Sequence, residues 1–254
     1  MLELNKVYNE DCIGENGMCL IEDKSIDMIL CDLPYGTTKN KWDSIIPFNV
    51  LWDQYNRIIK DNGAIVLFGS QPFTSKLILS NEKLFRYDLI WDRGKGKDFL
   101  NANRKPLKSH EEICVFYKHL PTYNKQYWYS TPYIYNEKFG EKDTSLTINS
   151  SSGSQYNKHK LVTTQSKDGK RNPLSVLNFQ YVAPREQMHP SQKPIKLCEW
   201  LINSYTNEND LVLDNCMGSF TTAVACKNLN RNYIGFELDS TYYDLGQQRL
   251  NNIQ

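Results

Sequence analysis

The chain of 254 residues carries a formal net charge of +1, with 40% hydrophobic and 23% charged residues. This length is enough for one large domain, or a domain with an insertion, and for a substantial core. A net charge near zero excludes attraction of a polyanion by the whole surface, so a nucleic-acid partner would have to be held by a local basic patch.

The seven cysteines are scattered, with no C-x-x-C pair and no matching His cluster. This spacing argues against both a zinc site and a disulfide framework. No stretch reaches the roughly 18 consecutive apolar residues of a membrane helix, and residues 1–10 lack the apolar segment of a signal peptide. We therefore expect a cytoplasmic protein with reduced thiols, no metal and no membrane partner.

The first elements of the chain lead to a short polar motif. Residues 9–12 come just before a short stretch, ending near Ile21, that we expect to be helical, and the Asp11 carboxylate either caps that helix or contacts a ligand. The apolar run 26–31 has the length and composition of a buried strand, and the Pro and Gly that follow end it in a turn. Asp32-Leu33-Pro34-Tyr35 is therefore expected at the carboxyl end of a strand, where open α/β sheets bind ligands.

The residue types of this tetrapeptide suit one particular chemistry. An exocyclic amine of a nucleobase is a poor nucleophile because its lone pair is delocalised into the ring. The Asp32 carboxylate and the backbone carbonyl of Leu33 or Pro34 could each accept one N–H bond and draw the nitrogen towards tetrahedral geometry. The Tyr35 ring offers a face on which an extruded base can stack. An ordinary Pro-containing turn with Asp32 as a cap is the competing interpretation, because short motifs recur by chance.

Residues 37–43 form a polar loop that carries Lys39, Lys41 and one large aromatic residue, Trp42. We interpret this loop either as a mobile lid or as a segment that Trp42 anchors. The helical spacing of apolar residues over 47–60 then predicts a helix, and Asp61-Asn62-Gly63 is expected to close it.

Strands and helices alternate after this point. We expect a strand over 64–68, a helix over 72–80, and strands over 85–91 and 112–117 that pair as an antiparallel edge. Strands that alternate with helices are typical of βαβ units, so the sequence predicts a mostly parallel sheet.

The segment between the last two strands is polar and basic. A charge run of this kind is often only a solvated loop. Beside a candidate catalytic strand end, however, it suits phosphate contacts, which position a duplex without reading its sequence. The residues predicted to contact DNA are Lys39, Lys41, Arg93, Lys95, Lys97, Arg104 and Lys105.

The region 119–188 interrupts the α/β pattern with interleaved tyrosines and lysines and a Ser-rich loop. Aromatic and basic residues in alternation suit a nucleic-acid groove. Long loops in a compact domain tend to be functional or disordered. We interpret 119–188 as an inserted recognition region, with partial disorder as the competing interpretation.

The α/β pattern resumes at His189-Pro190-Ser191-Gln192-Lys193-Pro194, whose final proline suits the first turn of a helix. The expected elements are a helix from 195, a strand over 210–213, a helix over 223–229, a strand over 232–236 and a last helix over 240–252.

This final strand, turn, helix and strand resembles a nucleotide-binding unit. Gly218 would let the backbone approach a ligand closely, and Glu237, about 20 positions after the first strand, could accept both hydroxyls of a ribose. One glycine in place of three does not make a phosphate cradle. The pattern therefore favours a nucleoside ligand without phosphates.

Together, these segments resemble the S-adenosylmethionine-dependent DNA amino-methyltransferases of the permuted β group. Asp32-Leu33-Pro34-Tyr35 is similar to the family's Asp-Pro-Pro-Tyr, and residues 189–194 are similar to its His-Pro-Thr-Gln-Lys-Pro. The loop from Asp214 resembles the family's Asp-Pro-Phe-x-Gly-Ser-Gly-Thr-Thr, and Glu237 matches its ribose-binding acid. The resemblance covers nearly the whole chain except the region 119–188.

The resemblance implies an α/β fold: a Rossmann-like methyltransferase sheet, mostly parallel with an antiparallel edge, in circularly permuted motif order. The catalytic half would be 1–118, the inserted target-recognition region 119–188 and the cofactor-binding half 189–254. The implied catalytic residues are Asp32, Leu33, Pro34 and Tyr35. Those implied to bind S-adenosylmethionine are Asp11, Asp32, Ser191, Gln192, Lys193, Asp214, Asn215, Gly218, Ser219, Thr221, Thr222 and Glu237.

Three residues of the cofactor loop depart from the family pattern. Asn215 and Cys216 replace Pro and Phe, and Phe220 stands where the second glycine is usual. Phe220 either begins the helix and points into the core or crowds the methionine end of the cofactor. We expect competent binding, because the other matches survive.

The resemblance implies direct methyl transfer to a flipped base, without a covalent enzyme intermediate. In the family, Asp at the first motif position usually accompanies adenine N6 transfer, so Asp32 favours adenine over cytosine N4. Similar motifs would also suit a protein-glutamine methyltransferase, an RNA amino-methyltransferase or a catalytically degenerate DNA-binding protein. The partner is expected to be double-stranded DNA, with a homodimer and a cognate restriction endonuclease as further partners that the family allows.

Overall fold

The computed structural model describes residues 2–38, 40, 43–129, 170–183, 185 and 187–252. By internal contacts, the chain divides into one unit formed by 1–124 and 174–254 and a second formed by 125–173. In the second unit, β6 (Trp128–Tyr129) pairs antiparallel with β7 (Lys170–Arg171). Most of the predicted recognition region 119–188 lies outside the described residues, because 130–169 are not among them.

The first unit contains an eight-stranded sheet of order β1-β10-β9-β2-β3-β5-β4-β8. The neighbouring pairs are parallel except for β3–β5 and β5–β4, so β5 alone runs against the others. The strands are β1 (Lys6–Tyr8), β2 (Ile26–Cys31), β3 (Ile59–Gly69), β4 (Phe85–Lys97), β5 (Lys108–Phe116), β8 (Val176–Asn178), β9 (Leu211–Asp214) and β10 (Asn232–Phe236). The predicted mostly parallel Rossmann-like sheet is confirmed.

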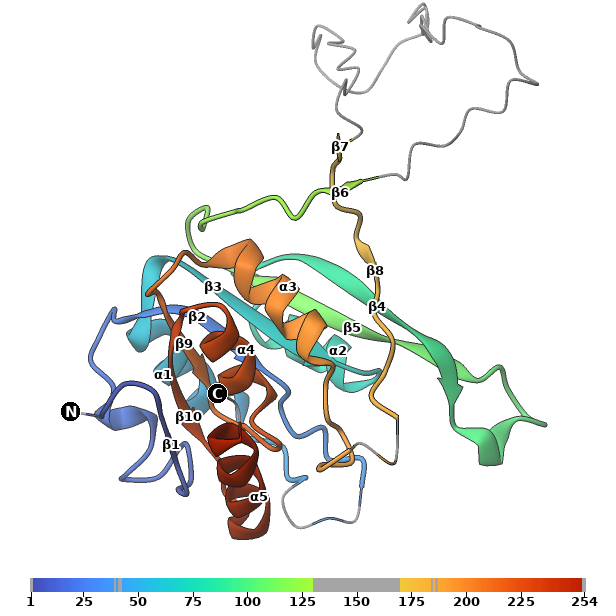
Figure 1. The fold of residues 1–254 in the computed structure, drawn as a ribbon, viewed down its shortest axis with the longest axis horizontal. Coiled ribbons are helices and arrows are strands. Elements are labelled where there is room, and N and C mark those ends of the chain that lie inside the picture. The colour runs from blue at the N-terminus through green and yellow to red at the C-terminus, as the bar shows by residue number, and fades with distance from the viewer. Residues whose placement is uncertain are drawn as a thin grey trace, which may run out of the picture. The chain divides into compact units, whose positions relative to one another are not determined.

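Helices cover both faces of this sheet (Figure 1). Along β2, Met28 and Leu30 join the core cluster of one face while Ile29 and Cys31 join the other, as the twofold alternation of a strand requires. The first cluster includes α3 (Ile195–Tyr205) and α4 (Thr221–Asn228), with α5 (Ser240–Asn251) packed against it; the second includes α1 (Phe48–Ile58) and α2 (Phe73–Ser80). A strand buried on both faces explains the continuous apolar run 26–31.

The two halves of the chain meet where β2 pairs with β9, with Met28 opposite Val212 and Ile29 opposite Leu213. From β2 the chain continues to β3 on one side, and from β9 it continues to β10 on the other. Parallel sheets bind ligands where the strand order reverses in this way. Asp32 and Asp214, near the carboxyl ends of these adjacent strands, are thus brought to the same edge.

Several predicted local elements were wrong. Asp61-Asn62-Gly63 does not close a helix: β3 begins at Ile59 directly after α1, and these residues fall in a bulge between the register positions of Ile59 and Ala64. The short helix expected between Cys12 and about Ile21 is reduced to one 3₁₀ turn, η1 (Met18–Leu20). The short strands β1 and β8 were not predicted, because three residues carry little periodic signal.

None of the helices in the described part of the chain has the length and apolar character needed to span a bilayer. Within the same residues, no group of three or more His, Cys, Asp or Glu side chains could hold a metal ion.

Candidate active site

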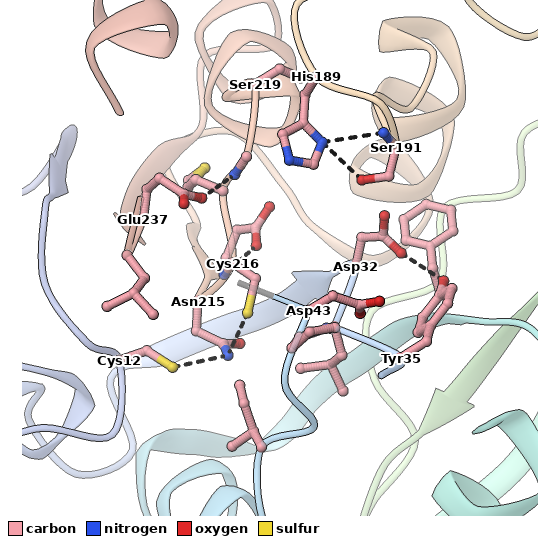
Figure 2. A pocket seen from close by; sticks show the side chains of 18 of the residues that line it. Cys12, Asp32, Tyr35, Asp43, His189, Ser191, Asn215, Cys216, Ser219 and Glu237 are labelled. Carbon is pink, nitrogen blue, oxygen red and sulfur yellow. Dashed lines mark hydrogen bonds between the residues drawn. The ribbon is translucent and has the colours of Figure 1, made fainter. Parts of the chain in front are cut away.

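A cavity of about 520 Å³ opens at the carboxyl edge of β2 and β9. Every residue predicted to act in catalysis or cofactor binding lines this cavity, from Asp11 to Glu237. Figure 2 shows Asp32 and Tyr35 together on one side of the pocket and Glu237 on the other. The two distant segments identified in the sequence therefore form one site.

Asp32 has a hydrogen-bond donor on each carboxylate oxygen. The Tyr35 hydroxyl donates to Oδ1 at 2.6 Å, and the Lys193 ammonium donates to Oδ2. Burial, together with the charge of Asp32, raises the pKa of Tyr35, so its phenol stays protonated and remains a donor. The Tyr35 ring also contacts Phe73, with centroids 4.9 Å apart. These contacts fix both the carboxylate and the aromatic face.

Lys193 connects Asp32 to a second carboxylate, that of Glu111, which was not among the residues predicted for the site. Its Nζ lies 3.3 Å from Glu111 Oε2 and 4.9 Å from the centre of the Phe68 ring. Burial would lower the pKa of Lys193, but the charges of Asp32 and Glu111 outweigh it and raise that pKa. Lys193 is therefore a cation at neutral pH although only 7% of it is exposed.

Glu111 is held in turn by cations from β4. Lys97 Nζ donates to Glu111 Oε1 at 2.9 Å, and Arg93 Nη1 lies 3.4 Å from the same oxygen. Glu111 begins the buried part of β5, at the point where a polar segment becomes an apolar strand. This position was the sequence signal available for Glu111, because a buried acidic side chain at the start of an apolar strand needs a charged or hydrogen-bonding partner.

The cofactor loop after β9 is organised around Asp214 and Glu237. Thr222 Oγ1 donates to Asp214 Oδ2 at 2.6 Å, and the Cys216 N–H donates to Oδ1 at 3.0 Å. The Gly218 N–H donates to Glu237 Oε2 at 2.6 Å. Gly218 has φ +52°, a left-handed conformation that favours glycine, and this accounts for its presence in the loop.

Asn215 and Cys216 replace the family's Pro and Phe without disrupting the loop. Asn215 Oδ1 accepts a 2.5 Å hydrogen bond from Tyr55 of α1, and its Nδ2 lies 3.6 Å from the sulfur of Cys12. The side chain therefore ties β9 to α1 across the sheet edge. Asp11, beside Cys12, is not a helix cap: its Oδ1 accepts from the Ile13 N–H in a turn that lines the cavity.

Residues 189–193 form another wall of the cavity. The Ser191 N–H and hydroxyl lie 3.2 and 2.9 Å from His189 Nδ1, and Gln192 Oε1 accepts from the Met188 N–H. Burial lowers the pKa of His189 to about 4, so the ring is neutral near pH 7. The sequence motif thus folds into a self-bonded turn that presents Ser191, Gln192 and Lys193 to the cavity.

Two further residues organise the site without a clear sequence signal. Arg249 of α5 donates to the Ser219 carbonyl at 2.6 Å and to Thr221 Oγ1 at 3.0 Å, which anchors the cofactor loop. Asp43 accepts from the backbone N–H groups of Gly36, Thr37 and Thr38 at 2.6–2.9 Å. Burial acts to raise the pKa of Asp43, but the three backbone donors outweigh burial, and the pKa is lowered. Asp43 therefore stays ionised and holds the loop after Tyr35 through these hydrogen bonds.

The predicted DNA contacts are placed unequally. Arg104 and Lys105 are exposed, and Lys95 lies near Tyr181, whereas Lys97 lines the cavity. Arg93 is only 7% exposed; its guanidinium lies beside Glu111, 5.3 Å from the centre of the Trp91 ring and 5.7 Å from that of Tyr181, and its contact with DNA stays a prediction. Lys39, Lys41 and the lid residue Trp42 lie outside the described residues.

Phe220 is buried rather than aimed into the cavity. It is fully buried, its φ is +58°, and a Cβ added at Gly246 would lie 2.3 Å from its ring.

We expect Phe220→Gly to lower the free energy of unfolding by roughly 2–4 kcal/mol, because the lost packing outweighs relief of the left-handed backbone. Urea unfolding would measure this loss. Calorimetry should find no gain in S-adenosylmethionine affinity, whereas a clear gain would show that Phe220 crowds the cofactor.

The charged Asp214 carboxylate destabilises the folded protein near pH 7. Burial raises its pKa to about 6, despite the donors Thr222 and Cys216. The folded state therefore binds the Asp214 proton more tightly than the unfolded state does. The stability that this proton contributes is fully present below about pH 4 and is lost as the pH rises through about 6. We expect the stability of Asp214→Asn relative to the wild type to increase by roughly 1–3 kcal/mol between pH 4.5 and 7.5. Urea unfolding at both pH values tests this, and a pH-independent difference would contradict it.

Comparison with known proteins agrees with the site. The family model described as DNA methylase matches residues 26–248. Type II methyltransferase M1.MboII of Moraxella bovis is 24% identical, over 100% of this chain and 99% of that protein. The protein in the crystal structure of the M1.HpyAVI-SAM complex has 24% sequence identity and a TM-score of 0.61, over 96% of this chain and 99% of that one. PvuII DNA methyltransferase (cytosine-N4-specific) has 16% sequence identity and a TM-score of 0.67, over 98% of this chain and 87% of that one. Because the family model spans most of the chain, this protein belongs to the N6/N4 DNA methylase family.

Proposed function

We propose that the protein transfers a methyl group from S-adenosylmethionine to the N6 amine of an adenine that is flipped out of double-stranded DNA. The observation that carries this proposal is that Asp32, Tyr35, Gly218 and Glu237 all line one shared cavity. This arrangement supports a reaction between an amine held beside Asp32 and Tyr35 and a nucleoside cofactor held by Gly218 and Glu237. The SAM complex named for M1.HpyAVI supports the same cofactor here.

The residues present fit this cofactor. Glu237 carries its carboxylate at the end of β10, where it can accept from ribose hydroxyls while the Gly218 N–H holds it. Gly218 leaves the loop open to close approach, and Asp11, Ser191, Gln192 and Asn215 line the remaining walls. When bound, S-adenosylmethionine supplies an electrophilic methyl group on a sulfonium.

Asp32 and the carbonyl of Leu33 or Pro34 are assigned to the target amine. Each would accept one N–H, so that the nitrogen lone pair is directed away from the ring and towards the methyl group. Tyr35 would stack on the base while its hydroxyl holds Asp32. The chain has no Pro-Cys dipeptide, so a cysteine-nucleophile mechanism of the cytosine C5 type has no candidate residue.

Cytosine N4 transfer remains the second candidate, since the PvuII enzyme named as cytosine-N4-specific shares the fold with a TM-score of 0.67. Asp at the first motif position favours adenine. The proposal extends to partners: the type II name of M1.MboII supports a cognate restriction endonuclease, and the β-group resemblance supports a homodimer.

Nucleoside mass spectrometry of DNA from cells that express the protein tests the proposal, with Asp32→Ala as the negative control. N6-methyladenine above the control level is the expected result, and strand-resolved mapping would then give the recognition sequence. N4-methylcytosine in its place would favour the second candidate. Unmodified DNA would favour a catalytically degenerate DNA-binding protein.

A further inference from the structure

The hairpin between β4 and β5 presents two large apolar side chains to solvent. Phe99 is 82% exposed and Leu100 is 95% exposed, both within the 3₁₀ turn η2 (Phe99–Asn101). Single exposed apolar residues are common on protein surfaces, but two adjacent and almost fully exposed ones at a projecting tip call for a binding role.

Hydrogen bonds close the tip into a turn. Asp98 adopts a left-handed conformation, its carbonyl accepts from the Asn101 N–H at 2.8 Å, and its carboxylate accepts from Lys105 at 2.5 Å. Gly96 of β4 packs against Leu107, the residue before β5, and an added Cβ at Gly96 would lie 2.5 Å from the Leu107 side chain. The backbone that carries Phe99 and Leu100 is therefore closed into a turn, from which both side chains point to solvent.

The hairpin projects from the edge of the sheet that holds the active site. Because β5 is antiparallel to both β3 and β4, β4 runs parallel to β3 and β2, and its carboxyl end lies at the same edge as Asp32. Lys97, the last residue of β4, lines the cavity, and Phe99 follows two positions later. Figure 1 shows this hairpin extending beyond the neighbouring strands of the sheet.

We propose that Phe99 and Leu100 form a wedge that enters the DNA base stack beside the target nucleotide and holds the extruded base out of the duplex. This inference rests on the proposed function, because only a flipped base creates the gap that the wedge would fill. Apolar side chains inserted between base steps are an established means of unstacking DNA, and an aromatic ring replaces part of the lost stacking.

The charges around the tip favour DNA over a second protein surface. Lys95, Arg104 and Lys105 are exposed beside it, and the nearby acid, Asp98, is paired with Lys105. Cations around a small apolar tip match the phosphates on either side of a base step. A second copy of the chain that met this tip with its own tip would instead bring the same cations against each other.

The test compares Phe99→Ala/Leu100→Ala with the wild type in single-turnover methyl transfer on a duplex that contains the mapped recognition sequence. We expect a loss of about 10- to 100-fold on the fully paired duplex, because the variant must extrude the base without the wedge. On the same duplex with an abasic site opposite the target, where extrusion costs less, the rates should agree within about threefold. Leu79→Ala, which truncates another side chain that is 68% exposed, is the matched control.

An undiminished rate on the paired duplex would overturn the wedge. So would an equal loss on both duplexes, which would indicate a general loss of affinity or of folding, and calorimetric S-adenosylmethionine affinity would separate these two causes. A change in oligomeric state by light scattering would assign the tip to self-association instead. If the wild type transfers no methyl group to either duplex, the proposed function itself fails.

Discussion

Asp32→Ala is expected to reduce methyl transfer by at least about a thousandfold. In the proposed reaction, the carboxylate accepts one N–H of the target amine, and alanine leaves that amine planar and poorly nucleophilic. S-adenosylmethionine affinity should stay within about threefold of the wild type, since Asp214, Gly218 and Glu237 remain in place. Transfer is measured with a radiolabelled methyl group, and affinity by calorimetry.

Asp32→Asn is the matched variant for this experiment. It keeps the shape of the side chain and an oxygen that can accept from Tyr35, but it removes the charge that faces Lys193. Lys193 keeps Glu111 as a counter-ion in both variants, so the fold should persist. A parallel loss of transfer and of cofactor binding would show that Asp32 supports the architecture of the pocket rather than the reaction.

Lys193→Met is expected to lower transfer at pH 7 by roughly 10- to 100-fold. The Lys193 ammonium donates to Asp32 Oδ2 and lies 3.3 Å from Glu111 Oε2, so it holds in place the carboxylate that accepts from the target amine. Methionine cannot donate a hydrogen bond, and Asp32 Oδ2 then loses this donor. Single-turnover transfer of a radiolabelled methyl group measures the loss.

Rescue by Lys193→Arg separates this role from a merely structural one. Glu111 keeps Arg93 and Lys97 as partners when Lys193 is replaced, which limits the damage to the core. Lys193→Arg should restore most of the rate, since it returns a charged donor beside Asp32. An undiminished rate in Lys193→Met would contradict the role assigned to Lys193, and urea unfolding would show whether a lost rate reflects a lost fold.

The predictions that came from the residues themselves concern local pattern and order along the chain. The apolar run of β2 and the spacing of α1, α3 and α5 predicted most elements, because twofold and helical periodicities are local properties. The break between Asp32 and Gly36 and the lone Gly218 marked two turns, and their resemblance to family motifs named the chemistry. Order along the chain also indicated that the catalytic motif precedes the cofactor motif.

The contacts between distant segments were decided only by the tertiary structure. Pairing of β2 with β9 puts Asp32 and Asp214 at one edge, and the return of β5 brings Glu111 to Lys193. Neither contact has a sequence spacing that predicts it, because strand order depends on which buried faces pack together.

Phe220 illustrates the same division. Its identity suggested either a blocked pocket or a core contact, and the absence of a side chain at Gly246 on α5 selects the core. Sequence alone determined which groups this protein carries and in what order. The packing of strands and helices decided which of those groups meet, since burial is a property of the whole fold and not of any one segment.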